Sequence, residues 1–227
     1  MNPPLTPEQL DALRRFSSPT VCNAIETFNV RPRNEGFMDS TIRCQFPELG
    51  AMAGYAVTAK MQAHEQPTKE LHHAKIWEEL ARIPKPWVIV IEDVDYPAPI
   101  GSYWGEVNAS VYAALGAAGV VTNGGVRDLP EVRPTGFHLF ASCVLVSHAY
   151  AHVFEAGKPV TVGGLTVRPG HLLHADQHGI TNIPLEIAAN LPDACSAIES
   201  GERRLIDYAR TDNPSIEQLK QMYGEVD

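Results

Sequence analysis

The apolar segment Pro86–Ile91 (PWVIVI) constrains the fold more than any other stretch of the chain. It is far shorter than the roughly 18–20 apolar residues that a membrane-spanning helix needs. The same holds for a second strongly apolar run, Phe140–Val146 (FASCVLV). A short apolar run followed by acidic residues, here 92–95 (EDVD), is typical of a buried strand. The sequence therefore predicts a strand at residues 87–91 inside a layered domain, and no membrane-spanning segment.

Helices and strands are predicted on both sides of this strand, in an order that is not strictly βαβ. The first helix begins at Thr6, where Thr-Pro-Glu-Gln has the form of a capping box with Pro in the first turn. Further helices are predicted at 18–28, 69–83, 108–118 and from 213, strands at 51–61 and 119–122, a turn at 123–125, and a Gly-Gly hairpin at 160–167. This mixture favours a single mixed α/β layered domain over residues 1–227, with a helical tail from about residue 185, over a Rossmann sheet.

The charge balance of the chain argues against one class of partner. Its 227 residues include 18 Lys and Arg against 27 Asp and Glu, which gives a formal net charge of −9. Nucleic-acid phosphates are bound by clustered Lys and Arg, so no nucleic-acid partner is expected. The first sixteen residues lack the basic and apolar regions of a signal peptide. The four cysteines are widely spaced, which favours free thiols in a cytoplasmic protein over two disulfides.

The residues with the clearest chemistry lie between Gly101 and Glu131. A glycine-containing loop leads into a helix at residues 105–108, and the N–H groups at such a helix end attract an anion, for example a carboxylate. After the next strand, Arg127 offers a planar fork for a carboxylate or an enolate oxygen. Asp128 offers an oxygen ligand of the kind that Mg²⁺ or Mn²⁺ binds. Together these groups suit an α-keto acid. The alternative is that Arg127 and Asp128 form a structural ion pair that closes a turn.

This stretch resembles the family of class II 4-hydroxy-4-methyl-2-oxoglutarate and oxaloacetate-type pyruvate aldolases, which also includes the RNase E regulator RraA. The family's hallmark is an acidic residue, twenty intervening residues, Arg-Asp, and a further acidic residue after two more. Here these are Glu106, Arg127, Asp128 and Glu131. The resemblance implies a layered α/β/α-type fold with mixed sheets, of the swivelling β/β/α type. It also implies a homotrimer or homohexamer with active sites at the subunit interfaces.

The resemblance further implies a role for each matching residue. Asp128 would bind the divalent metal, Mg²⁺ or Mn²⁺, largely through water, and Arg127 would stabilise the charge on the C2 oxygen of an enolate. Glu106 would position or deprotonate a water that carries the proton. The carboxylate of pyruvate would be held by the backbone amides of Gly105, Val107 and Asn108. The implied activity is that of a lyase: retro-aldol cleavage of a 4-hydroxy-2-oxo acid to pyruvate, with oxaloacetate decarboxylation as a companion activity.

Three departures from the family pattern leave a second function open. The family aldolases usually have Asp where this chain has Glu106, and many members have Asp where it has Asn123. Residues 62–86 are unlike the family's shorter segment. An extra methylene at position 106 shifts a carboxylate by more than about 1 Å, which affects proton transfer. The alternative to a lyase is a non-catalytic, protein-binding regulator of the ribonuclease-inhibitor type, although the presence of Asp128 favours an enzyme.

Nine histidines suggest a metal site, an interpretation that we do not favour. The candidates are the pair His148 and His152 and the group His171, His174 and His178. A zinc-binding HExxH helix carries a glutamate after its first histidine, which the pair lacks. The segment after Gly170 is predicted to be extended. His72 and His73 are expected on a helix surface, with a place beside the site as the alternative.

Five acidic residues and one lysine complete the candidates. Glu92, Asp93 and Asp95 are expected to be solvated charges at a strand end, with support of the site as the alternative. Glu199 or Glu202 resembles an acidic residue that a neighbouring subunit contributes to the site in this family. Lys60 could form a Schiff base, but it is remote in sequence from Arg127 and is not expected to do so.

Overall fold

A mixed eight-stranded sheet forms the centre of the molecule, with the strand order β1-β5-β4-β3-β2-β9-β10 and β6 paired with β2. The structure is a computed structural model, and it describes residues 4–67 and 73–224. The strands are β1 (Arg43–Cys44), β2 (Met52–Gln62), β3 (Trp87–Asp93), β4 (Ala117–Val126), β5 (His138–Val144), β6 (His152–Ala156), β9 (Leu172–Asp176) and β10 (Gly179–Ile183). Neighbours among β2, β3, β4 and β5 pair in parallel, and the remaining pairs are antiparallel.

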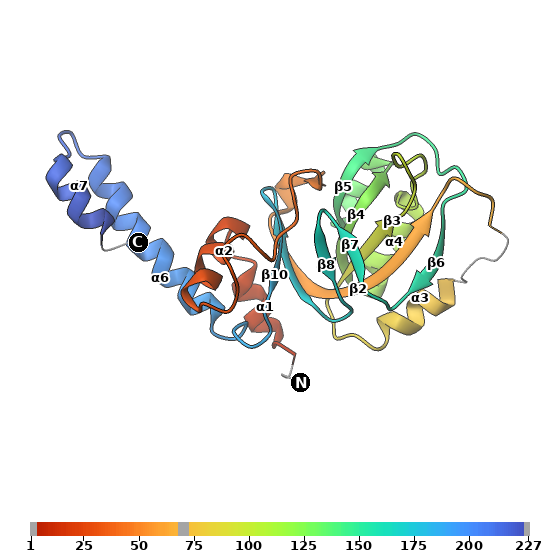
Figure 1. Cartoon of the computed structure of the whole chain (residues 1–227), viewed down its shortest axis with the longest axis horizontal. Coiled ribbons are helices and arrows are strands. Elements are labelled where there is room, and N and C mark those ends of the chain that lie inside the picture. The colour runs from red at the N-terminus through yellow and green to blue at the C-terminus, as the bar shows by residue number, and fades with distance from the viewer. Residues whose placement is uncertain (1–3, 68–72, 225–227) are drawn as a thin grey trace.

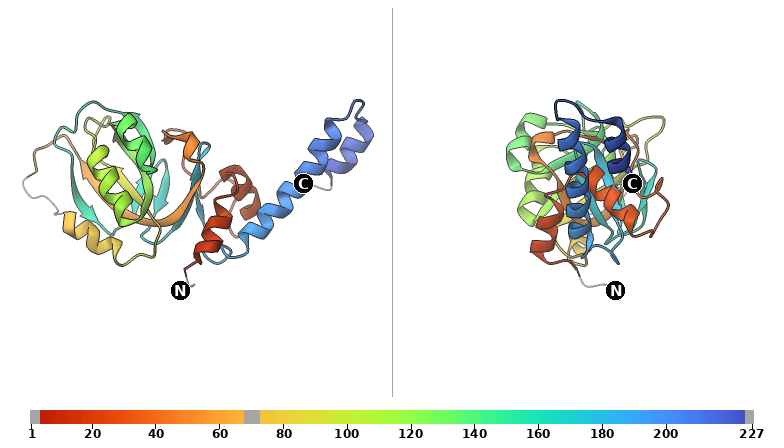
Figure 2. Two further views of the ribbon diagram at one scale, coloured as in Figure 1. Left: turned by 180° about the vertical axis from the view of Figure 1, so that it is seen from behind. Right: turned by 90° about the vertical axis from the view of Figure 1, so that its left-hand side faces the viewer.

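Helices cover one face of this sheet. Helix α4 (Glu106–Leu115) covers the middle of that face and helix α3 (His73–Leu80) covers its lower edge in the left view of Figure 2. Ile89 and Ile91 of β3 point toward them and are fully buried in one cluster of apolar side chains. Successive residues of a strand point to opposite faces, so β3 contributes to the core on both sides.

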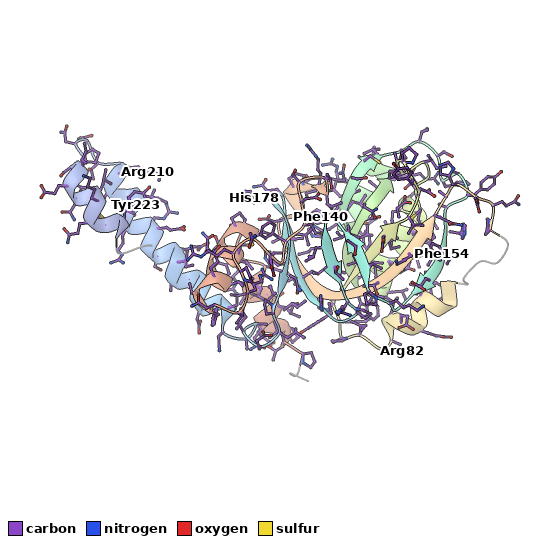
Figure 3. The ribbon with its side chains drawn as sticks, viewed as in Figure 1. Arg82, Phe140, Phe154, His178, Arg210 and Tyr223 are labelled. Atoms are coloured by element: carbon purple, nitrogen blue, oxygen red, sulfur yellow. The ribbon has the colours of Figure 1, made fainter. Side chains whose placement is uncertain are left out.

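A hairpin covers the opposite face. It consists of β7 (Val160–Val162) and β8 (Leu165–Val167), which pair with each other and pack on the central strands. Val88 and Val90 of β3 are buried beneath it, and Phe140 points into the same layer (Figure 3). The order hairpin, sheet, helices is that of a β/β/α fold. The prediction of a mixed α/β layered domain is therefore confirmed.

A third apolar cluster joins the terminal helices at the other end of the sheet. Helix α1 (Pro7–Leu13), helix α2 (Ser18–Thr27) and the first part of helix α6 (Leu191–Ala209) pack together beside β9 and β10. The rest of α6 projects away from the sheet, and α7 (Ile216–Tyr223) folds back beside it (Figure 1). The arm formed by these two segments carries Arg210 and Tyr223 far from the sheet (Figure 3).

The predictions for the first helix cap, the Gly-Gly hairpin turn and the cysteines are confirmed. Thr6 caps α1 through a capping box with Gln9. The Gly163-Gly164 turn joins β7 to β8 with positive φ at both residues, as a primed hairpin turn requires. The four cysteines are free thiols. None of the helices in the described ranges is long and apolar enough to cross a membrane.

Other local predictions are wrong or shifted. The turn predicted at 123–125 lies within β4, where the register with β5 shifts between Thr122 and Gly125 and the extra residue forms a bulge. Helix α4 spans 106–115, because Gly116 has a left-handed φ of 102° that ends it before Ala117. The last helix begins at Ile216 with Ser215 as its N-cap. Of the helix predicted at 69–83, residues 73–80 form α3, and 69–72 lie outside the described residues.

Candidate active site

The first turn of α4 is capped by the side chain of a residue that follows strand β4. Gly105 occupies the N-cap position and has no side chain to cap the helix. The backbone N–H of Glu106 instead donates a hydrogen bond of 3.0 Å to Oδ2 of Asp128, which follows β4. The first N–H groups of a helix have no partner within that helix. The N–H groups of Val107 and Asn108, in this first turn, therefore lack partners within the helix, and both residues line a cavity.

The end of β4 fixes Arg127 and Asp128 in place. The bulge at residues 123–125 bends β4, and the N–H of Arg127 then donates to the carbonyl of Trp104 at 2.9 Å. Asp128 has a left-handed conformation with φ of 55° and ψ of 41°, and the short helix α5 (Leu129–Val132) starts directly after it. A non-glycine residue in this conformation is uncommon and marks a position held by its surroundings. The turn directs the carboxylate back toward α4.

Glycine at position 105 is required by this close approach. A Cβ atom added at Gly105 would lie 2.3 Å from Oδ2 of Asp128 and 3.1 Å from both Cγ and Nε of Arg127. The φ of Gly105 is −148°, so the requirement comes from space and not from backbone conformation. The glycine lets the helix end, the guanidinium and the carboxylate meet at one point.

A cavity of about 260 Å³ opens at this point. It is lined by Ser102, Tyr103, Gly105, Val107, Asn108, Arg127, Asp128, His148 and Ala151. Five of the six predicted site residues are thus brought together. The sixth, Glu106, is exposed and is not part of the lining.

Sequence reasoning missed four lining residues as members of this site. Ser102 and Tyr103 belong to the glycine loop that pointed to an anion site, so their position could have been inferred. His148 and Ala151 come from the loop after β5, and the sequence suggested His148 only as a possible zinc ligand paired with His152. His152 lies on β6, with Nδ1 2.8 Å from the carbonyl of Tyr150, so the two histidines are not on one helix.

The polar atoms left at the cavity suit an anion and one divalent cation. Asp128 Oδ2 accepts from Glu106 and lies 3.4 Å from Nε of Arg127, whereas Oδ1 makes no hydrogen bond within residues 4–67 and 73–224. These residues include no group of three or more His, Cys, Asp and Glu placed to hold a metal. Mg²⁺ is commonly held by one or two carboxylates and keeps several waters. A single carboxylate with an open oxygen therefore fits such an ion, and does not fit a closed zinc site.

The acidic end of β3 differs from the prediction of solvated charge. Asp93 is only 4% exposed, and burial raises the pKa of its carboxyl group to about 6. Its Oδ1 accepts from the N–H of Asp95, while Oδ2 has no hydrogen-bond partner in the described structure. Asn123 spans the two strands here: its side chain accepts from the N–H of Asp93 and donates to the carbonyl of Asp93, both at 2.8 Å. Asn123 therefore ties the bulge of β4 to the end of β3.

The remaining candidates lie elsewhere. Lys60 forms an ion pair of 3.2 Å with Glu92, which gives this lysine a structural partner. His174 is fully buried against Ser18 and the carbonyl of Leu13. Glu199 and Glu202 lie on α6, at the opposite end of the molecule from the ends of β4 and β5 (Figure 1). Within one chain they are remote from Arg127.

Comparisons with known proteins agree with this architecture. A sequence profile of the RraA-like family, described as Aldolase/RraA, matches residues 18–181. Protein DlpA of Legionella pneumophila is 26% identical over 175 residues, a match that covers 75% of this chain and only 27% of DlpA. A Halalkalibacterium halodurans protein named "Putative 4-hydroxy-4-methyl-2-oxoglutarate aldolase" is 31% identical over 71 residues, which are 31% of this chain and 34% of that protein.

A solved structure supports the same fold. Streptomyces coelicolor RraAS2, described as an unusual member of the RNase ES inhibitor RraA protein family, has a TM-score of 0.66 and 24% identity. The superposition covers 92% of this chain and 100% of RraAS2. The profile match includes the glycine loop, helix α4 and the Arg127-Asp128 pair, and it spans well over half of the chain. The chain therefore belongs to the RraA-like (Aldolase/RraA) family.

Proposed function

We propose that this chain is a divalent-metal-dependent lyase that cleaves a 4-hydroxy-2-oxo acid to pyruvate by a retro-aldol reaction. Oxaloacetate decarboxylation is its companion activity, because both reactions leave a pyruvate enolate. One observation carries the proposal: Arg127, Asp128 and residues of the first turn of α4 line one cavity. The family includes aldolases as well as ribonuclease regulators, and the Halalkalibacterium relative bears an aldolase name.

The chain's own groups would bind the keto acid at two points. The N–H groups of Val107 and Asn108, at the positive end of the α4 dipole, would bind the substrate carboxylate. The guanidinium of Arg127 would donate to the C2 oxygen, where negative charge develops as the C3–C4 bond breaks. This side chain is only 34% exposed, so its charge is partly protected from screening by water.

Asp128 would hold Mg²⁺ or Mn²⁺ through Oδ1. When bound, the metal would supply positive charge beside the C2 oxygen and so lower the energy of the enolate. Oδ2 would stay on the N–H of Glu106 and keep the carboxylate in one orientation. Glu106 would act from the rim, through water, because its side chain is exposed and outside the cavity lining.

The proposal includes a homotrimer or homohexamer that closes the cavity. The outer face of α4 exposes Val107, Val111 and Leu115 at i, i+4 and i+8, a row beside the cavity that suits a subunit interface. Val107, the residue nearest the helix end, is 75% exposed. The same row is the observation that favours the second candidate function, a non-catalytic regulator that binds another protein through this face.

Measurement of pyruvate release decides between the two. Purified protein is supplied with oxaloacetate or 4-hydroxy-4-methyl-2-oxoglutarate, with Mg²⁺, with Mn²⁺ or with EDTA. We expect turnover with either metal, loss of turnover with EDTA, and a loss of at least about 10²-fold in Asp128→Asn. Asp212→Asn, on the distant arm, is the matched control and keeps wild-type rates. Turnover that survives both EDTA and Asp128→Asn would exclude a metal-dependent lyase, and no turnover of either substrate would favour the regulator.

A further inference from the structure

His148 lies on the wall of the cavity that also contains Arg127 and Asp128. It belongs to the loop of residues 145–151 that connects β5 to β6. The loop follows the Arg127-Asp128 pair in the chain, whereas α4 precedes it. All of strand β5 lies between the pair and the loop, so no local motif links them. Its position is a property of the fold.

The loop is held firmly against the body of the protein. The N–H of Leu145 donates to the carbonyl of Val126 at 2.9 Å, and the N–H of Ser102 donates to the carbonyl of Ser147 at 3.0 Å. On the far side of His148, the N–H of Tyr150 donates to the carbonyl of Ala63 at 3.2 Å. These bonds fix the chain before and after the histidine.

Two backbone features show how closely the loop is fitted. A Cβ atom at Gly101 would lie 2.5 Å from the carbonyl oxygen of His148, so only glycine allows this approach. Ala149 has a φ of 45°, a left-handed conformation that is costly for alanine. Strained positions of this kind persist where the surroundings hold them, and they concentrate at functional sites.

The ring of His148 is oriented by its neighbour. Its Nδ1 lies 2.7 Å from the carbonyl oxygen of Ala149. A carbonyl oxygen can only accept, so Nδ1 carries the hydrogen and Nε2 of the neutral ring has a free lone pair. Across the described ranges, Nε2 makes no hydrogen bond of its own. The loop therefore places an unpaired proton acceptor at the cavity.

We propose that neutral His148 is the general base that removes the C4 hydroxyl proton in the retro-aldol reaction. This inference rests on the proposed function. Nε2 takes the hydroxyl proton, and the C4–O bond becomes the carbonyl of the released product. The C3–C4 bond breaks, and its electron pair forms the enolate whose C2 oxygen faces Arg127. The imidazolium then returns its proton to C3, which yields pyruvate and neutral His148.

His148 is better placed for this step than Glu106. A general base must lie within hydrogen-bond reach of the proton that it takes, directly or through one water. Both side chains are exposed, but His148 lines the cavity and Glu106 does not. The histidine, and not the acidic residue, therefore borders the cavity in which the substrate would lie.

The two reactions of the proposed lyase separate this role from a structural one. Oxaloacetate has no C4 hydroxyl, so its decarboxylation needs the enolate site and no base at His148. We expect His148→Asn to lower kcat for retro-aldol cleavage by about 10²–10⁴-fold. Decarboxylation by the same preparation should change by less than about threefold, which also reports that the variant is folded. Pyruvate affinity, measured by calorimetry with Mg²⁺ present, should match the wild type.

Further variants test the chemical identity of the group. In His148→Ala, added imidazole should restore part of the retro-aldol rate and leave decarboxylation unchanged. Glu106 is the rival base, and Glu106→Gln tests it. The assignment would be overturned if Glu106→Gln selectively lost retro-aldol cleavage while His148→Asn kept the wild-type rate of that reaction. An equal loss of both activities in His148→Asn would also overturn it, while leaving the proposed lyase intact. A wild-type protein inactive on both substrates would reject the lyase and the base together.

Discussion

Oδ2 of Asp128 accepts a hydrogen bond of 3.0 Å from the backbone N–H of Glu106. Asp128, the second residue after β4, therefore caps the helix that precedes β4, and this contact closes residues 106–128 into one unit. The same residue lines the cavity, and its Oδ1 makes no hydrogen bond within the described part of the chain. The positions of this carboxylate and of the helix end cannot change independently, so the proposed anion site and the proposed metal ligand form a single structural element.

Gly105→Ala tests this relationship directly. The added Cβ would lie 2.3 Å from Oδ2 of Asp128, so either the carboxylate or the helix end must move. We expect kcat/KM for pyruvate release to fall by at least about 10²-fold, since displacements of about 1 Å have effects of this size. Gly201→Ala, where an added Cβ meets nothing within 4 Å, is the control. It should raise the free energy of unfolding by about 0.5–1 kcal/mol, because alanine favours a helix interior over glycine.

Arg127→Lys tests whether catalysis needs the planar guanidinium group of Arg127 or only its positive charge. Lysine keeps the charge and loses the paired N–H groups that can donate to an enolate oxygen. We expect kcat to fall by about 10²–10³-fold for oxaloacetate and for the 4-hydroxy-2-oxo acid alike. This equal loss differs from the selective loss expected at His148. Steady-state assays with both substrates distinguish the patterns, and an unchanged kcat would contradict the role given to Arg127.

The site could be predicted from the sequence only where it is local in the chain. The glycine loop, the start of α4 and the Arg127-Asp128 pair are separated by one helix and one strand, so a resemblance over thirty residues was enough to bring them together. His148 could not be placed, because its position depends on how the loop after β5 packs against Gly101 and Ala63. That packing is a long-range property of the sheet.

The two wrong predictions near the site have a common cause. Asn123-Gly124-Gly125 is equally compatible with a turn and with a bulge inside a strand, and pairing with β5 selects the bulge. The burial of Asp93 follows from the same feature, since a Cβ at Gly124 would lie 2.8 Å from Oδ2 of Asp93. A solvated strand end was expected because acidic residues are seldom buried. The burial of Asp93 depends on how the neighbouring strand β4 packs beside it, and the sequence does not show that packing.

Asn123→Asp restores the residue that many family members have and is expected to destabilise this chain. The amide of Asn123 donates to the carbonyl of Asp93 and accepts from its N–H, whereas an ionised carboxylate can only accept. The substitution leaves a carbonyl without its donor and places a second charge beside Asp93. We expect the free energy of unfolding to fall by about 1–3 kcal/mol at pH 7. Urea unfolding followed by circular dichroism measures this. Equal stability of the two proteins would show that Asn123 does not tie the strands together.

Asp93→Asn should change how stability depends on pH. Burial raises the pKa of the Asp93 carboxyl group from an ordinary value of 3.8 to about 6 in the folded protein. The folded state therefore favours the protonated form, and this contribution to stability is complete below about pH 4 and is lost as pH rises through about 6. Asparagine stays neutral and keeps an oxygen for the N–H of Asp95. The variant therefore does not lose this stability as the pH rises. Relative to the wild type, its free energy of unfolding should gain on the order of 2 kcal/mol between pH 4 and pH 7. Urea titrations at half-unit intervals measure the difference between the two curves. Curves that remain parallel from pH 4 to pH 7 would show that the Asp93 carboxyl group titrates alike in the folded and unfolded chain.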